Sequence, residues 1–137
     1  MTDATLQALA ALRAPDLAAF EQLAREAFER LPEAFRQLCG DIVFIVQEFP
    51  DQEALAAVGL ENEFDLLGLY EGIDISHDAA LRTDVNRIFL YRRPLLDYWS
   101  EHDETLGHLV THVLIHEIGH HVGLSDEDME AIEAAAG

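Results

Sequence analysis

Histidine and carboxylate residues gather in one short stretch of the sequence, HEIGHHVGLSD, which spans His116 to Asp126. His116 and His120 are four residues apart, so on a helix their imidazoles project from one face about one turn apart. Two such imidazoles can share one metal ion, and zinc suits these ligands. Glu117 lies beside the first histidine, where a carboxylate can take a proton from an activated water. The spacing therefore predicts a hydrolytic zinc centre with Glu117 as general base.

Two residues beyond the histidine pair extend this pattern. Gly123 stands three residues after His120, where a positive φ can end the helix and turn the chain back. Asp126 then falls where a third protein ligand can complete a four-coordinate zinc site with one water. Asp126 can equally be a first-turn acid of a following helix that Ser125 caps, and the two roles are compatible. We expect Asp126 to be the third ligand.

Other histidines and aromatic residues near this stretch carry weaker signals. His108 and His112 continue the four-residue ladder, which is open to a second metal or a proton relay but is more typical of polar cleft lining. His121 points about 100° away from His120, so it is expected to be packed or at the surface. Core or strand-end roles are favoured over substrate contacts for the remaining candidates, which are Tyr91, Arg92, Arg93, Tyr98 and Trp99.

The elements that must position these residues follow from apolar periodicity. The strongest helical pattern covers residues 104–122, with Gly123 as its end. Strands are predicted from β-branched and aromatic runs, at residues 42–46, 66–70 and 87–92. Further helices are predicted around Leu6, Leu9 and Leu12 and at residues 17–31, 33–38, 51–58 and 126–135, whereas 73–86 is polar and irregular. The order predicts an α+β fold, a small mixed sheet of three to four strands packed with helices.

Composition and charge narrow the class of protein. The 137 residues suit a single domain, 1–137, and the 50% apolar content argues against a disordered acidic chain. There are 27 acidic and 8 basic residues, and the net charge of −19 repels phosphate backbones and anionic membranes. We therefore expect no nucleic-acid partner and no membrane partner. Cys39 is the only cysteine and no signal peptide is recognisable, so a buried thiol and a cytoplasmic location are expected.

The HExxHxxGxxD motif resembles the metzincin-type zincin signature in its aspartate variant, as in the snapalysin-like peptidases. The longer string HEIGHHVGLSDEDM, with LLGLYEG at 66–72 and RIFLYRRPLL at 87–96, is similar to the single-domain bacterial zincin-like metallopeptidases, the minimal zincins. This similarity covers roughly residues 40–130 and implies a zincin-like fold in which a small sheet packs over the active-site helix. It also implies one catalytic Zn²⁺ held by His116, His120 and Asp126, with Glu117 as general base.

The leading hypothesis is a zinc-dependent metallopeptidase acting on a peptide or protein substrate that lies extended along a sheet edge. By analogy with zincins this edge is Leu67–Tyr70, with Arg87–Tyr91 as the second choice. Only eleven residues follow Asp126, whereas larger metzincins form a lower wall with a Met-containing turn. This difference keeps open a zinc-binding or interaction module with little or no turnover. A metal hydrolase acting on nucleic acid is disfavoured by the charge.

Overall fold

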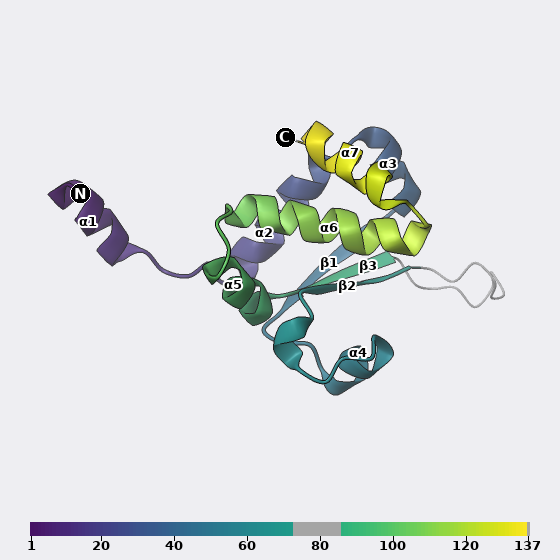
Figure 1. The fold of residues 1–137 in the computed structure, drawn as a ribbon, viewed down its shortest axis with the longest axis horizontal. Helices are drawn as coiled ribbons and strands as arrows, with labels where there is room; N and C mark the ends of the chain where they lie inside the picture. The colour runs from purple at the N-terminus through teal and green to yellow at the C-terminus, as the bar shows by residue number, and fades with distance from the viewer. Residues whose placement is uncertain (73–85, 137) are drawn as a thin grey trace.

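The computed structural model of the chain describes residues 1–72 and 86–136, in which α-helices surround a three-stranded sheet (Figure 1). The predicted irregular stretch 73–86 lies outside the described residues except for Asn86. The strands are β1 (Ile42–Gln47), β2 (Gly68–Glu71) and β3 (Asn86–Tyr91). β1 is parallel to β3 and β2 is antiparallel to it, so the predicted α+β class with a small mixed sheet is confirmed.

The order of the strands decides which sheet edge is free. The order is β1-β3-β2, so β3 is central and the two outer strands each present one unpaired side among the described residues. The first-choice edge, Leu67–Tyr70, therefore overlaps an outer strand, β2. The second choice, Arg87–Tyr91, is wrong, because β3 forms backbone hydrogen bonds with a strand on each side and cannot accept another.

Two long helices, α2 (Leu17–Glu29) and α6 (Leu106–Val122), cover one face of the sheet, as Figure 1 shows. Strand side chains alternate between the two faces, and those on this face are apolar. The main core buries residues from both layers, among them Phe20, Ala24, Phe44, Tyr70, Ile88, Leu90, Val110, Leu114 and Ile118. The predicted helix 104–122 is thus confirmed as α6 and lies directly on the sheet.

The opposite face of the sheet is covered by a smaller apolar cluster. Helix α4 (Gln52–Ala57) and the 3-10 helix η1 (Glu63–Asp65) lie on this side (Figure 1). Leu55, Leu66 and Tyr91 are buried in this cluster. The Asp51 side chain caps α4 by accepting a hydrogen bond of 2.7 Å from the backbone N–H of Ala54.

The third strand ends one residue before the end of its predicted range, 87–92. β3 ends at Tyr91, because Arg92 already begins α5 (Arg92–Ser100). Pro94 therefore lies in the first turn of a helix, where its missing N–H costs no hydrogen bond. α3 (Glu33–Cys39) and α7 (Asp126–Ala136) occur close to their predicted ranges, and the Cys39 thiol is buried as expected.

Helix α1 (Asp3–Ala11) lies apart from the layers described above and is joined to α2 by an extended segment (Figure 1). The Thr2 side chain caps it by accepting a hydrogen bond from the N–H of Thr5. None of its residues is buried, and Leu6 and Leu9 are both about half exposed. The helix is confirmed, but its leucines take no part in the core.

No helix among the described residues combines the length and the apolar character needed to cross a bilayer.

Candidate active site

The two ends of helix α6 are determined by the capping residues Thr105 and Gly123. The Thr105 hydroxyl accepts a hydrogen bond of 3.1 Å from the N–H of His108, which caps the first turn. Gly123 adopts a left-handed conformation with φ of 82°, and the N–H of Leu124 donates to the carbonyl of Gly119 at 2.9 Å. A side chain at residue 123 would strain this turn. The predicted stop at Gly123 is confirmed.

After this turn, α7 runs back along α6. Ser125 and Asp128 form a reciprocal cap, each side chain accepting a hydrogen bond from the other residue's N–H, at 3.1 and 3.2 Å. Met129 is fully buried against α6 at Gly119, where an added Cβ would lie only 2.5 Å from the Met129 Sδ. The absence of a side chain at Gly119 therefore allows the two helices to pack closely.

The histidine ladder predicted on α6 is present. The ring centroids of His112 and His116 are 4.0 Å apart, and those of His116 and His120 are 5.7 Å apart. Glu117 is partly buried beside this ladder. Burial raises the pKa of the Glu117 carboxyl above its ordinary value, and the nearby His120 opposes the shift. A raised pKa makes a carboxyl a better proton acceptor near neutral pH.

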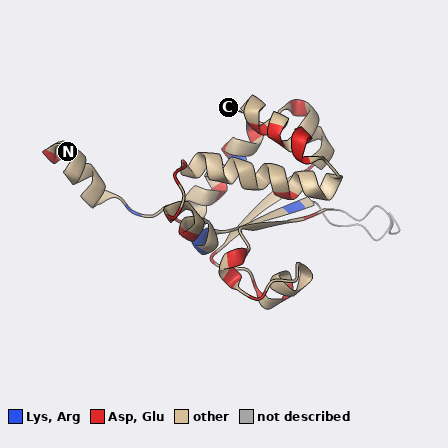
Figure 2. Ribbon diagram, in the orientation of Figure 1, with Lys and Arg blue, Asp and Glu red and all other residues tan. Residues whose placement is uncertain are grey.

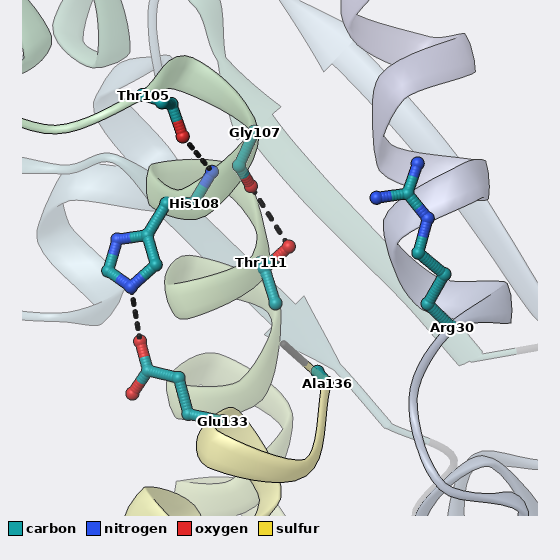
Figure 3. Close-up of a pocket in the computed structure, with 7 residues that line it drawn as sticks. All are labelled: Arg30, Thr105, Gly107, His108, Thr111, Glu133 and Ala136. Atoms are coloured by element: carbon teal, nitrogen blue, oxygen red, sulfur yellow. Dashed lines mark hydrogen bonds and ion pairs between the residues drawn. The ribbon is translucent and has the colours of Figure 1, made fainter.

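A carboxylate from α7, Glu133, faces the same ladder. Its Oε1 lies 2.7 Å from the His112 Nδ1 and 3.8 Å from the His108 Nε2, and its Oε2 lies 3.7 Å from the His116 Nε2. Figure 3 shows Glu133 and His108 facing each other across the two helices. His108 also meets the carboxylate of Glu104 at 2.7 Å. The side of α6 facing α7 therefore carries three imidazoles that lie close to the carboxylate of Glu133.

A pocket of about 210 Å³ lies beside His108 and Glu133 (Figure 3). Glu133 and His108 line it on one side and Arg30, from the end of α2, lies across from them. Thr111, which also lines the pocket, donates its hydroxyl to the carbonyl of Gly107 at 2.9 Å. The α6 residues that line the pocket therefore belong to the N-terminal half of the helix, and the motif histidines His116 and His120 are not among them.

Three of these residues meet the geometric requirement for a metal site. Within the described part of the chain, ligand atoms of His112, His116 and Glu133 all lie within 4.8 Å of one another. Donors bound to one zinc ion at about 2.2 Å cannot be more than about 4.4 Å apart. Small side-chain adjustments would therefore satisfy one ion, and two imidazoles with a carboxylate are ligands that zinc accepts. The chemistry of this side of α6 fits zinc.

The sequence profile of the zincin-like metallopeptidase family matches residues 39–136, which include every element from the end of α3 to α7. The chain belongs to this family. The match confirms the predicted resemblance to the zincin-like metallopeptidases, and it supports a zinc-binding, peptidase-like protein. No curated protein matches the chain significantly.

Within this zincin-like fold, the residues predicted from the motif are placed as follows. His116 and His120 are neighbours on α6, and Glu117 lies between them in sequence with its side chain partly buried. Asp126 is the exposed first residue of α7, and no hydrogen bond or ion pair joins its side chain to another described residue. The assignment of His116, His120 and Asp126 as ligands and of Glu117 as base stays a prediction.

Glu133 is the residue that sequence reasoning missed. Its approach to the zincin helix depends on the turn at Gly123 and on the close packing of Met129, and both act across the α6–α7 contact. One sequence signal could have revealed it: Met129 and Glu133 are four residues apart, so they share the face of α7 that is turned to α6. His112, which the sequence predicts to line the cleft, also belongs to the group that can hold a metal.

The remaining candidates take mainly packing roles. The ring of His121 contacts Tyr70 edge-on, with centroids 4.7 Å apart, so this exposed histidine is packed on β2. Tyr91 is buried, and Tyr98 stacks on His102 at 3.7 Å. Arg92 pairs with Glu48 at 3.0 Å, Arg93 lies over the Phe49 ring, and the Trp99 indole donates to the carbonyl of Glu104.

Proposed function

We propose that this zincin-like protein is a zinc-dependent metallopeptidase that hydrolyses peptide bonds with Glu117 as general base. The observation that carries this proposal is the position of Glu117, a partly buried carboxylate of raised pKa, between the two histidines of the zincin motif on one helix. The family match supports the same class of chemistry.

The residues proposed to hold the metal are His116 and His120, with Asp126 as the third ligand. When bound there, zinc would supply the positive charge that activates water and polarises the scissile carbonyl. Desolvation lowers the pKa of His116 below its ordinary value, which favours the neutral imidazole required of a ligand. His112 lowers this pKa further, whereas Glu133 raises it.

Glu117 is proposed to move the proton in both halves of the reaction. Its carboxylate accepts a proton from the attacking water and then donates that proton to the leaving amine. Burial, which raises the pKa of this carboxyl, brings its two protonation states closer in free energy at neutral pH. One residue can therefore act first as base and then as acid.

The substrate is proposed to pair with the free side of β2. This strand lies directly on α6, since an added Cβ at Gly68 would be 2.9 Å from the Val113 Cγ1, and Tyr70 contacts His121 near the end of the helix. An extended peptide added to this edge would form backbone hydrogen bonds beside the second half of α6. The high negative charge supports peptide rather than nucleic-acid substrates.

Digestion of a peptide library tests this proposal. We expect the zinc-loaded protein to cleave, a chelator to stop cleavage, and added zinc to restore it. Glu117→Gln should retain bound zinc but lose cleavage, whereas the matched control Glu127→Gln, an exposed acid on α7, should cleave like wild type. Cleavage that survives in zinc-loaded Glu117→Gln, or a zinc-loaded wild type that cleaves no peptide, would contradict the mechanism.

A second candidate is a zinc-binding module with little turnover. The observation that favours it is the group of His112, His116 and Glu133, which offers three protein ligands without His120 or Asp126. Zinc held only by this group would raise the melting temperature without supporting hydrolysis. The same library digestion separates the two candidates.

A further inference from the structure

The face of the sheet opposite α6 carries a pocket of about 230 Å³ that the proposed peptidase chemistry does not use. Leu69 on β2 and the neighbouring β3 residues Phe89 and Tyr91 form its apolar surface. α4 and the cap that precedes it form another wall. We call this cavity the Tyr91 pocket; its polar lining residues are Gln47, Asp51, Glu53 and Glu71.

The Tyr91 hydroxyl is the first sign that a ligand belongs here. Tyr91 is 1% exposed, and its hydroxyl forms no hydrogen bond with any described residue. No fully covered side-chain oxygen or nitrogen lacks a partner in the described part of the chain, so the Tyr91 oxygen keeps a small exposed area. Tyr91 lines the cavity, and we infer that its oxygen is exposed there. A hydroxyl that is nearly covered and has no protein partner keeps its hydrogen-bonding capacity for a ligand in the cavity.

The charge of the pocket indicates the sign of the ligand. Three carboxylates line it, and none of its lining residues is lysine, arginine or histidine. Burial first, and then the charges of Asp51, Glu71 and Glu117, raise the pKa of Tyr91 to about 12, so the hydroxyl keeps its proton. Figure 2 shows further acidic positions on the α4 and η1 side of the sheet. The pocket therefore favours a cation.

Its carboxylates are only partly engaged by the protein. Asp51 uses Oδ1 to cap α4 and keeps Oδ2 for another donor. Glu71 meets Arg87 at 3.9 Å, in an exposed pair of the kind that contributes little. The apolar walls at Leu69 and Phe89 suit an alkyl chain more than a bare metal ion.

We propose that the Tyr91 pocket binds the arginine or lysine side chain of an extended peptide. The alkyl part lies against Leu69 and Phe89, and the head group donates hydrogen bonds to Asp51, Glu71 and the Tyr91 oxygen. Leu69 and Glu71 stand on the outer strand β2, so a peptide paired with that edge directs alternate side chains to this face. The peptide pairing rests on the proposed function, and it would give the peptidase a preference for basic substrates.

Calorimetric titration of zinc-loaded Glu117→Gln protein tests the pocket without cleavage. The probes are acetyl-AARAA-amide and the same peptide with citrulline, which is uncharged and nearly the same shape, in place of arginine. We expect the arginine peptide to bind about tenfold more tightly than the citrulline peptide, because hydrogen bonds that involve a charged group contribute more than neutral ones. The difference should shrink as the salt concentration rises.

Variants of the lining residues locate the binding. Tyr91→Phe and Asp51→Asn, each added to Glu117→Gln, should remove most of the arginine preference; asparagine keeps the cap of α4. Glu101→Gln, at an exposed acid that follows the last residue of α5 and does not line the pocket, changes the charge equally and should leave the preference intact. If Tyr91→Phe does not fold, as judged by thermal unfolding, Asp51→Asn still carries the test.

Equal affinity for the arginine and citrulline peptides would overturn the proposal, as would an arginine preference that both lining variants retain. Agmatine, a free alkylguanidinium, binding as tightly as the peptide would contradict the peptide part. If the arginine peptide binds no better than the citrulline peptide but the zinc-loaded wild type still cleaves the library, only the proposal for the Tyr91 pocket is overturned. If the arginine peptide binds more tightly but the zinc-loaded wild type cleaves no peptide, only the proposed peptidase function is overturned.

Discussion

The two ends of helix α7 present carboxylates in different settings. Asp126 begins the helix and is exposed, and its side chain forms no hydrogen bond or ion pair with another described residue. Glu133 lies about two turns later, its side chain is only 17% exposed, and it faces three histidines of α6. The position of Asp126 is determined by the turn between α6 and α7, whereas the position of Glu133 is determined by the packing of α7 on α6.

This difference separates two ways in which a metal can be held. A ligand at the first turn of α7 depends on the Gly123 turn alone, whereas Glu133 depends on the whole α6–α7 contact around Met129. His116 is common to the ligands predicted from the motif and to the group found in the structure. The predictions below test which end of α7 matters for zinc.

The largest effect is expected for His116→Ala, because both sets of ligands contain His116. We expect zinc affinity to fall by more than about 100-fold, beyond the loss typical of residues that only support a ligand. Competition titration with a chromophoric chelator measures it. His102→Ala, an exposed histidine outside the ladder, is the control and should not change zinc affinity. Unchanged zinc affinity in His116→Ala would exclude both sites.

The next effect concerns the contact that places Glu133. Met129 is fully buried against Gly119, and its truncation to alanine should lower the free energy of unfolding by roughly 2–5 kcal/mol. Urea unfolding of the metal-free protein measures the loss. Glu130→Ala on the exposed side of α7 is the control. A loss no greater than the control's would mean that α7 is not held on α6 by this side chain.

Exchanging each acid for its amide compares the two ends of α7 directly. If Asp126 is a ligand, Asp126→Asn should reduce zinc affinity by about 100-fold, and Glu133→Gln, which alters a supporting contact, by about tenfold. The same chelator competition provides both values. The reverse order would move the third ligand to Glu133 and break the proposed assignment.

The smallest effect is a shift in the titration of His116. Desolvation lowers its pKa, and the negative charge and hydrogen bond of Glu133 partly raise it again. Removing that charge disfavours the imidazolium, so Glu133→Gln should lower the pKa of His116 further in the metal-free protein. Asp126 is not among the groups that shift this pKa, so Asp126→Asn should leave it unchanged. An NMR titration showing the larger shift in Asp126→Asn would reverse the comparison.

Local signals explain the parts of the structure that the sequence predicted well. α6, its end at Gly123 and the start of α7 at Ser125 depend on periodicity, a positive φ and capping within a few residues. The composition of the strands likewise predicted the sheet. These features require no knowledge of what packs against them.

Non-local contacts explain the rest. That β3 is central, which excludes it as a substrate edge, depends on pairing with two strands distant in sequence. Leu6 and Leu9 form a helical stripe, yet no residue of α1 is buried. Glu133 reaches the histidines only because α7 folds back over Gly119. A single sequence contains these residues but not the pairing that brings them together.

The central claim is that zinc is held by the histidine pair on either side of Glu117, and anomalous diffraction from crystals grown with Zn²⁺ tests it most directly. We predict one zinc peak in contact with His116, His120 and Asp126, within reach of Glu117. A peak held by His112, His116 and Glu133 without His120, or no peak on α6, would contradict the account.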